Sequence, residues 1–251
     1  MRVLVTGSRG FVGRQVCSDA KHEIVEFDTN IGLDVRNLHS LHEAMEGCDA
    51  VVHTAPVAID NVLAAARGKR IVNVSSVDVL GVFKGERAPD YLPLDDAHPK
   101  YAATPYGRQK LEAEQLLHCH DVPTVSLRPP GIWLQRTYAT IQAKRAERPS
   151  FEWDPFWEYG AFIDVHDMAR ACLAALTCPL DGHAALLVSA PDITTSGPTS
   201  REWAQRLHPE VEWRGGPEYA ADPYRTLLDI EPAKRILNWE PRCAWEDYSD
   251  S

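Results

Sequence analysis

Two residues on one predicted helix could carry acid–base chemistry. Tyr106 and Lys110 are one helical turn apart, so their side chains leave the helix on the same side. A phenol with a pKa of about 10 is a poor base at neutral pH, and a neighbouring ammonium lowers that pKa. Ser76 follows a buried apolar run and could hold a substrate oxygen while Tyr106 exchanges a proton; the neighbouring Ser75 could serve instead. Taken alone, Tyr106 and Lys110 could also be an exposed pair on a helix surface.

Three glycines near the N-terminus suggest an anion-binding turn. Gly7, Gly10 and Gly13 follow the apolar run Val3–Val5 and precede an amphipathic stretch. Glycine at these positions allows a tight turn, close approach of the backbone to a pyrophosphate, and packing of a helix against a strand. The N–H groups and partial positive charge of the helix N-terminus then attract the anion. This strand–turn–helix context predicts a dinucleotide-binding turn, and the alternative is an ordinary glycine-rich turn.

Two residues bear on which dinucleotide would bind. Asp28 ends the second predicted strand and lies 21 residues after Gly7. A carboxylate there accepts hydrogen bonds from the adenosine ribose and repels a 2′-phosphate, which favours NAD. Arg9, inside the glycine turn, could instead pair with a 2′-phosphate and favour NADP. Because Asp28 occupies the position that meets the ribose, we expect NAD, with NADP as the alternative.

Strands and helices that would position these residues alternate over the first 130 residues. Short β-branched runs at 3–5, 23–27, 49–53, 70–74 and 124–127 are separated by helix-like stretches at 11–20, 38–45, 59–67 and 102–117. This alternation indicates βαβ units, and continuous Val, Ile and Leu runs are typical of strands buried on both faces. We therefore expect an α/β fold with a doubly wound parallel sheet.

After residue 130 the alternation stops and proline and tryptophan become frequent. A length of 251 residues fits one large domain, or one domain with a smaller lobe. We expect residues 1–130 to form a dinucleotide-binding domain and residues 131–251 a small substrate-binding lobe that partly returns to the main domain. Within this second segment the sequence predicts helices near 165–176 and 199–207 and a strand near 184–189.

The order and spacing of several motifs resemble those of the extended short-chain dehydrogenase/reductases, the NAD-dependent epimerase/dehydratase family. The resembling segments run over almost the whole chain: Thr6–Gly13, Asp34–Val35, His53–Ala55, Val74–Gly81, Tyr106–Glu112, Arg128–Pro130, Phe162–Asp167 and Ala233–Pro241. The resemblance implies a Rossmann-like fold and an NAD-dependent enzyme. It also selects Ser76 over Ser75, because the family's catalytic hydroxyl lies five positions before the glycine that matches Gly81.

The resemblance, joined to the arguments above, gives a set of expected site residues. The catalytic residues are Ser76, Tyr106 and Lys110. Cofactor contacts are expected at Gly7, Arg9, Gly10, Phe11, Val12, Gly13, Asp28, Asp34, Val35, Thr54, Ala55, Tyr106, Lys110 and Pro129.

Three departures from the family bear on the substrate and on subunit contacts. Only 14 residues separate Pro56 from Ile71, so the helix that packs family dimers is shortened, and we expect a monomer or an atypical dimer. Relatives that act on nucleotide sugars carry an arginine just before the Phe-Ile-x-Val-x-Asp element, where this chain has Tyr159-Gly160-Ala161. That loss of a phosphate contact argues against a nucleotide-diphosphate substrate. Where the dehydratases have an Asp-Glu pair, this chain has Val77-Asp78, so Asp78 could be a lone base or only cap the local turn.

Aromatic residues gather between 151 and 162, where the family closes its substrate cleft. Their rings could stack on the apolar face of a sugar, or could pack the small lobe against the main domain. Candidate substrate contacts are Ser76, Asp78, Trp133 and Trp157. His118-Cys119-His120 has the side-chain types of a metal site, but adjacent helical residues point in different directions, so we expect no metal.

Composition argues against several other classes of protein. A net charge of −10 without a basic run argues against nucleic acid as a partner. No apolar stretch reaches the roughly 18 residues that span a bilayer, so no membrane partner is expected. The run Val3–Val5 is too short for the core of a signal peptide. Six scattered cysteines without a Cys-x-x-Cys motif suggest reduced thiols and a cytoplasmic location.

These observations lead to one main hypothesis and two alternatives. We expect an NAD(P)-dependent oxidoreductase that transfers a hydride between nicotinamide and a secondary alcohol or ketone of a small sugar-like or related metabolite. The first alternative is an NAD-dependent epimerase or dehydratase of a sugar or nucleotide sugar. The second is a non-catalytic NAD(P)-sensing protein, although such relatives usually lose the Tyr/Lys pair that this chain keeps.

Overall fold

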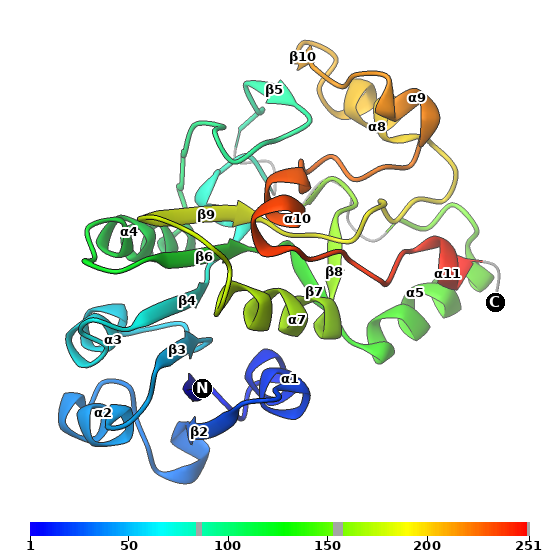
Figure 1. Ribbon diagram of the computed structural model, residues 1–251. Coiled ribbons are helices and arrows are strands. Elements are labelled where there is room, and N and C mark those ends of the chain that lie inside the picture. The colour runs from blue at the N-terminus through cyan, green and yellow to red at the C-terminus, as the bar shows by residue number, and fades with distance from the viewer. Residues whose placement is uncertain (84–86, 153–157, 250–251) are drawn as a thin grey trace.

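The computed structural model describes residues 1–83, 87–152 and 158–249. Its main sheet has six parallel strands in the order β2–β1–β3–β4–β6–β9. They are β1 (Arg2–Thr6), β2 (Glu23–Phe27), β3 (Ala50–His53), β4 (Arg70–Val74), β6 (Thr124–Arg128) and β9 (His183–Leu187). In the register, Val3 pairs with Ile24 on one side and Ala50 on the other. The predicted α/β fold with a doubly wound parallel sheet is confirmed (Figure 1).

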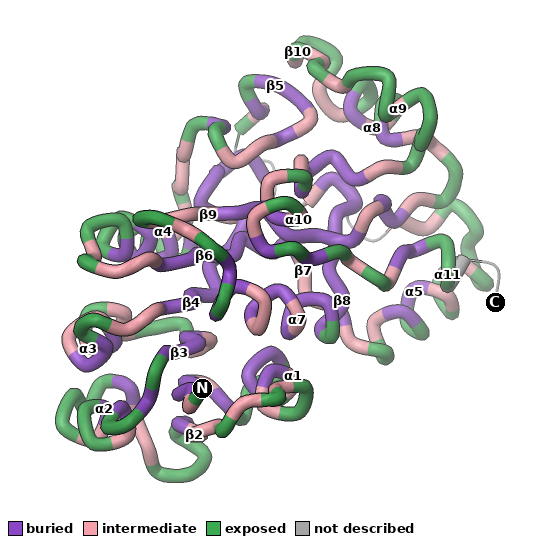
Figure 2. Tube along the Cα trace, in the orientation of Figure 1, coloured by how far each residue is buried: buried purple, intermediate pink, exposed green. Residues whose placement is uncertain are grey.

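Helices cover both faces of this sheet. One layer contains α1 (Phe11–Asp19) and α7 (Val165–Ala175), and the other contains α2 (Leu38–Met45), α3 (Ile59–Ala65) and α4 (Pro105–His118). Successive side chains of a strand point to opposite faces. Val3 and Val5 therefore join the core under α1 and α7, whereas Leu4 joins the core under α2 and α3. Figure 2 shows the result, with the inner strands β3, β4 and β6 mostly buried and the outer turns of α2 exposed.

The helix that carries Tyr106 begins later than the sequence pattern predicted. It starts at Pro105 rather than near residue 102. The side chain of Thr104 accepts a hydrogen bond from the Gly107 N–H at 2.9 Å, and Pro105 occupies the first helical turn. A threonine cap followed by proline fixes the start of a helix, and proline keeps the residue before it out of the helical region.

The chain after residue 130 contributes to the main sheet as well as to a smaller lobe. The predicted strand is β9, which pairs with β6, and the predicted helices are α7, which packs on α1, and α8 (Ser200–Leu207). The lobe at the top of Figure 1 contains α8, α9 (Glu218–Ala221) and the parallel pair β5 (Tyr91–Leu92) and β10 (Glu212–Trp213). Two further short strands pair in parallel, β7 (Gly131–Trp133) and β8 (Phe162–Asp164). The division of function at residue 130 stays a prediction.

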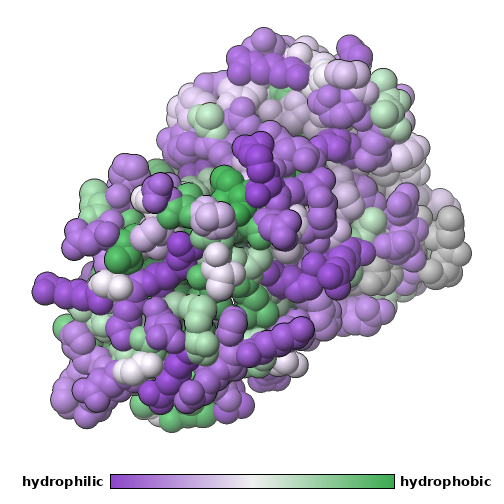
Figure 3. Space-filling view, viewed as in Figure 1, coloured by the Kyte–Doolittle hydropathy of each residue, from purple (hydrophilic) through white to green (hydrophobic). Residues whose placement is uncertain are grey.

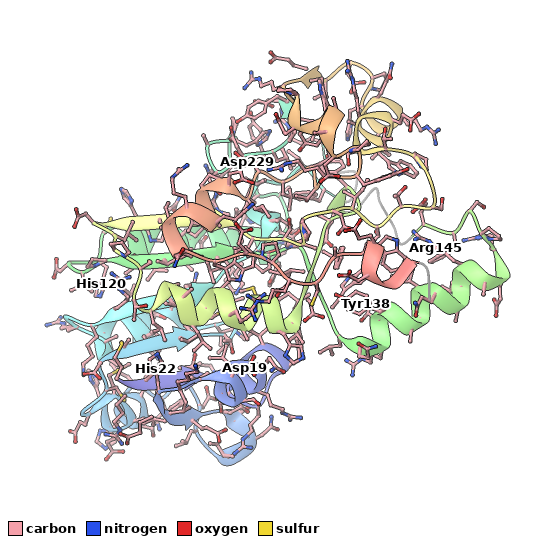
Figure 4. All side chains as sticks on the ribbon, turned by 45° about the vertical axis from the view of Figure 1, so that its right-hand side comes forward. Asp19, His22, His120, Tyr138, Arg145 and Asp229 are labelled. Atoms are coloured by element: carbon pink, nitrogen blue, oxygen red, sulfur yellow. The ribbon has the colours of Figure 1, made fainter. Side chains whose placement is uncertain are left out.

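An aromatic cluster holds α5 (Gln135–Glu147) against the rest of the protein. Trp133 packs against Phe162 with ring centroids 4.6 Å apart, and Tyr138 and Trp245 meet the same indole edge to face. The hydroxyl of Tyr138 also donates to Asp164 Oδ2 at 3.1 Å. Figure 4 labels Tyr138 on α5, near α11 (Glu246–Ser249). The helix before α11 is α10 (Glu231–Leu237), and it packs into the same core as α7.

One face of the molecule differs in polarity between its upper and lower parts. On the face in Figure 3, hydrophilic residues cover most of the upper lobe, and apolar residues appear in separate patches over the lower part. Among the helices of the described ranges, none is both long enough and apolar enough to cross a membrane.

A buried ion pair connects α4 to the sheet. Arg128 at the end of β6 donates to both carboxylate oxygens of Glu114 on α4, at 3.0 and 2.7 Å. The two side chains are only 3% and 5% exposed. The hydroxyl of Ser75, just after β4, donates to the same carboxylate at 2.6 Å. When one partner of a buried pair is removed, the other charge is left without compensation, which is strongly destabilising.

Glu114→Gln should therefore lower the free energy of unfolding by about 3 kcal/mol, because Arg128 stays charged and buried. Glu112→Gln is the matched control, since Glu112 lies on the same helix but is exposed, and it should change stability by less than about 0.5 kcal/mol. Urea denaturation of both variants measures the difference. Equal stabilities would contradict the structural importance of this pair.

Candidate active site

In the turn between β1 and α1, glycines allow backbone atoms to pack directly against each other. Gly7 has φ +69°, and a Cβ there would lie 2.6 Å from Thr54 Oγ1. A Cβ on Gly13 would lie 2.2 Å from the Gly7 carbonyl oxygen, so the first turn of α1 rests directly on the turn before it. Gly10 is the N-cap residue of α1 and contributes no side-chain hydrogen bond. The N–H groups at this helix end are thus available to an anion.

Asp28 follows β2 and lies next to this turn. Its Oδ2 accepts a hydrogen bond from the Arg9 N–H at 3.0 Å, and its Oδ1 accepts one from the Asn30 N–H at 2.8 Å. Burial favours the neutral acid, but these hydrogen bonds outweigh burial and lower the pKa of Asp28. The side chain is therefore a carboxylate at neutral pH. Each of its oxygens has a second lone pair for a ribose hydroxyl.

Asp34 and Val35 lie in the segment that leads from Asp28 to α2. Asp34 binds the Arg36 side chain through both oxygens, and its Oδ1 also accepts the Arg36 N–H at 2.9 Å. These contacts lower the pKa of Asp34 to about 2. Val35 is buried, and its carbonyl oxygen accepts a hydrogen bond from Asn61 Nδ2 at 2.9 Å. The backbone of this short segment is held firmly in place.

The three candidate catalytic side chains come from two elements. Ser76 follows β4 and caps the short 3-10 helix η2 (Val77–Val79), where its hydroxyl accepts from the Asp78 N–H at 3.1 Å. Tyr106 and Lys110 lie on α4, with Lys110 Nζ 5.6 Å from the centre of the Tyr106 ring. Lys110 Nζ donates to the Val74 carbonyl at 2.7 Å. Tyr106 is 44% exposed, so a ligand can reach its ring.

The electrostatics of Lys110 suit a proton-transfer site. Burial lowers its pKa from 10.5 to about 8, although the nearby carboxylate of Glu114 acts in the opposite direction. The ammonium is still the main form at neutral pH, and its charge favours the phenolate form of Tyr106. The hydroxyl of Ser75 already donates to Glu114, whereas Ser76 keeps its proton for a ligand. This difference supports Ser76 as the catalytic hydroxyl.

One cavity of about 610 Å³ brings most of the predicted residues together. Its wall joins the glycine turn and the two acidic positions to the catalytic side chains. The predicted residues on that wall are Gly7, Arg9, Gly10, Phe11, Val12, Asp28, Asp34, Val35, Thr54, Ala55, Ser76, Asp78, Tyr106, Lys110 and Pro129. A site predicted from seven separate stretches of sequence is thus continuous in space.

Three predicted residues stand apart from this wall. Gly13 acts through helix packing rather than by lining the cavity. Trp133 is 3% exposed within the aromatic cluster, so it supports the lobe instead of facing the cavity. Trp157 lies outside the described residues. The structure adds Arg36 and Glu158 to the wall, and neither was predicted. The sequence did offer a hint for Glu158, because it directly precedes Tyr159-Gly160-Ala161, where this chain differs from relatives that act on nucleotide sugars.

Metal ligands do not gather at the site. Across residues 1–83, 87–152 and 158–249, no three His, Cys, Asp or Glu side chains are placed to hold one ion.

Gly13→Ala should weaken dinucleotide binding by more than about tenfold, because a Cβ 2.2 Å from the Gly7 oxygen forces α1 away from the turn. Calorimetric titration with NAD⁺ measures this loss. Gly68→Ala is the control: Gly68 is not on the cavity wall, and although its positive φ strains an alanine, a Cβ there meets nothing within 4 Å. Equal affinities in the two variants would contradict the packing argument.

Lys110→Met should change how stability depends on pH. Between about pH 8 and 10.5 the unfolded chain binds a proton on Lys110 that the folded chain has released. The free energy of unfolding of the wild type should therefore rise across this window, by up to about 3 kcal/mol more than that of the variant. Urea denaturation at both ends of the window tests this. Parallel pH profiles for the two proteins would contradict a lowered pKa.

Comparisons of the sequence find a matching family model and two curated relatives. The model of the NAD dependent epimerase/dehydratase family matches residues 3–62. An uncharacterised UDP-glucose epimerase of Bacillus subtilis is 23% identical, over 98% of this chain and 95% of its own length. A 4-hydroxy-2-methyl-3-oxo-4-farnesyl-3,4-dihydroquinoline-1-oxide ketoreductase of Stigmatella aurantiaca is 28% identical, over 53% of this chain and 51% of its own.

Solved structures share the fold at low identity. UDP-glucose 4-epimerase from Brucella ovis, in complex with NAD, has a TM-score of 0.67 and 20% identity, covering 97% of this chain and 94% of its own. UDP-glucuronic acid 4-epimerase from Bacillus cereus, also with NAD, has a TM-score of 0.67 and 17% identity, covering 99% and 96%.

The matched segment 3–62 contains the glycine turn, Asp28 and the Asp34–Val35 pair, and the shared fold extends over the rest of the chain. The resemblance seen in the sequence is thereby confirmed. Residues 3–62 therefore match the model of the NAD dependent epimerase/dehydratase family, and the whole chain shares its fold with the NAD-bound epimerase structures.

Proposed function

We propose that this protein is an NAD-dependent oxidoreductase that transfers a hydride between nicotinamide and a secondary alcohol or ketone. One observation carries the proposal: Ser76, Tyr106 and Lys110 line the same cavity as the glycine turn and Asp28. A dinucleotide that lies along this wall with its pyrophosphate at the turn brings its two ends to Asp28 and to Tyr106.

The residues at the turn fit such a cofactor. Any Cβ at Gly7 or Gly13 would collide with neighbouring atoms, so the turn is built for close backbone approach. The glycine cap of α1 leaves N–H groups for a pyrophosphate, and the Asp28 carboxylate suits ribose hydroxyls. The same proposal assigns adenine contacts to Asp34 and Val35.

The side chains of the chain itself would move the proton. Tyr106 takes a proton from a substrate hydroxyl through its phenolate form, or returns one to a carbonyl oxygen. The Lys110 ammonium stabilises that phenolate, and the Val74 carbonyl fixes the position of the ammonium. The Ser76 hydroxyl holds the substrate oxygen near Tyr106. When bound, NAD accepts or supplies the hydride.

The cavity wall favours a substrate without a diphosphate. Among the described lining residues the cations are Arg9, Arg36 and Lys110, and the acidic side chains of Asp78 and Glu158 lie on the same wall. Tyr159 is 2% exposed and its hydroxyl donates to the Val82 carbonyl at 2.6 Å. This arrangement supports a small sugar-like or related polyoxygenated metabolite, which carries no phosphate for an arginine to bind.

An epimerase is the second candidate, favoured by the names of the relatives that share the fold. In that reaction the oxidised intermediate is reduced again on its other face while NAD stays bound. Incubation with NAD⁺ and a panel of free and nucleotide-linked sugars separates the two candidates. Net formation of NADH indicates a dehydrogenase, and isomer conversion without an absorbance change indicates an epimerase.

Two further aspects of the proposal concern the protein's surroundings. The shortened segment before β4 leaves α3 with only seven residues, which supports a monomer or an atypical dimer. We further propose a cytoplasmic location, which suits an enzyme that depends on NAD and keeps free thiols.

Tyr106→Phe should lower turnover by about 10²-fold or more, because the phenyl ring cannot exchange a proton. Affinity for NAD⁺ should stay within about threefold, since the ring and the Lys110 contact to Val74 remain. Steady-state NADH absorbance and calorimetry give the two quantities. Unchanged turnover on every active substrate would displace Tyr106 from its proposed role and would favour a protein that senses NAD without catalysis.

A further inference from the structure

We propose that Glu26 helps set the cofactor preference of this site by holding Arg9 away from the place where a 2′-phosphate would lie. The inference rests on the proposed function, because it concerns the dinucleotide that the cavity binds. It starts from an ion pair between the glycine turn and β2, in which Arg9 Nε lies 3.0 Å from Glu26 Oε2.

The backbone N–H and the side chain of Arg9 contact different carboxylates. The Arg9 N–H donates to Asp28 Oδ2 at 3.0 Å, which places the residue beside the position expected for the ribose. Its guanidinium, however, pairs with Glu26, two residues earlier on β2. Both charged groups also act on the pKa of Cys17 on α1, which burial raises to about 11. The guanidinium is therefore paired with Glu26, although its charge also helps to lower the pKa of the nearby Asp28.

The second arginine at this end of the cavity is held in the same way. Arg36 contacts both oxygens of Asp34, with Nε at 3.0 Å from each and Nη2 at 2.5 Å from Oδ2. Of the cations that line the described wall, only Lys110 remains, and it belongs to the catalytic group. Each arginine near the expected adenosine end is thus paired with a carboxylate of the chain.

A 2′-phosphate would consequently meet an unfavourable environment. It would lie next to the ionised Asp28, and its contact with Arg9 would compete with the Glu26 carboxylate for the same guanidinium. NAD carries a ribose hydroxyl there and needs no such displacement. Without Glu26, the arginine becomes available for a charge-assisted contact with the phosphate.

The test compares NAD⁺ and NADP⁺ binding by calorimetry in wild type, Glu26→Gln and the double variant Arg9→Ala/Glu26→Gln. Glu26→Gln should tighten NADP⁺ binding by about fivefold, the scale of one partly exposed ion pair. NAD⁺ affinity should change by less than about twofold, because NAD has no group that recruits the released guanidinium. The double variant should lose the gain for NADP⁺.

Glu23→Gln is the matched control. Glu23 lies at the other end of β2, where Arg2 Nε is 3.0 Å from its Oε1, so this variant removes the same charge from the same strand. The gain for NADP⁺ in Glu26→Gln should also shrink at high salt, because a half-exposed charge is screened.

Three results would overturn the role of Glu26 while NAD⁺ binding still supports the proposed function. They are an unchanged NADP⁺ affinity in Glu26→Gln, an equal gain in Glu23→Gln, or a gain that persists without Arg9. If the wild type binds neither dinucleotide, the proposed function fails first and the inference fails with it.

Discussion

The candidate site depends on a contact between backbone atoms: the first turn of α1 lies directly on the carbonyl of Gly7 because Gly13 has no side chain. This contact aims the N-terminal end of α1 at the space above the sheet. The sheet supplies the rest of the wall, since the ends of β1, β2, β3 and β4 meet at one edge. Thr54, Asp28 and Ser76 each follow one of these strands, so a parallel topology alone places them around one cavity.

The end of the cavity that contains Tyr106 and Lys110 is held by a polar network within the core. Glu114 receives hydrogen bonds from Arg128 on β6 and Ser75 after β4, and it lies one helical turn beyond Lys110. The carboxylate therefore does two things. It anchors α4 against two strands, and it partly offsets the burial that lowers the pKa of Lys110. The position of the ammonium and its charge are consequently linked to the packing of the main sheet.

Sequence reasoning predicted the fold and most of the cavity wall because both depend on the backbone. The period of the apolar runs defines the strands, and parallel strands bring distant motifs to a single edge. The directions of individual side chains were not predictable in this way. The ion pair of Arg9 with Glu26 and the place of Trp133 in an aromatic cluster instead of the cavity are two examples. Such outcomes depend on three-dimensional neighbours that no local pattern records.

The edge of the main sheet has a consequence for biosynthesis. β6 pairs with β9, whose last residue is Leu187, so one side of β6 remains without its partner until that part of the chain has left the ribosome. Open edges of this kind can recruit strands from other chains, especially next to apolar side chains such as Val125 and Leu127. A gene fragment that stops near codon 130 would expose the same edge permanently. Expression of residues 1–130 alone would therefore give an aggregation-prone product, whereas a chain that includes β9 covers this side of β6.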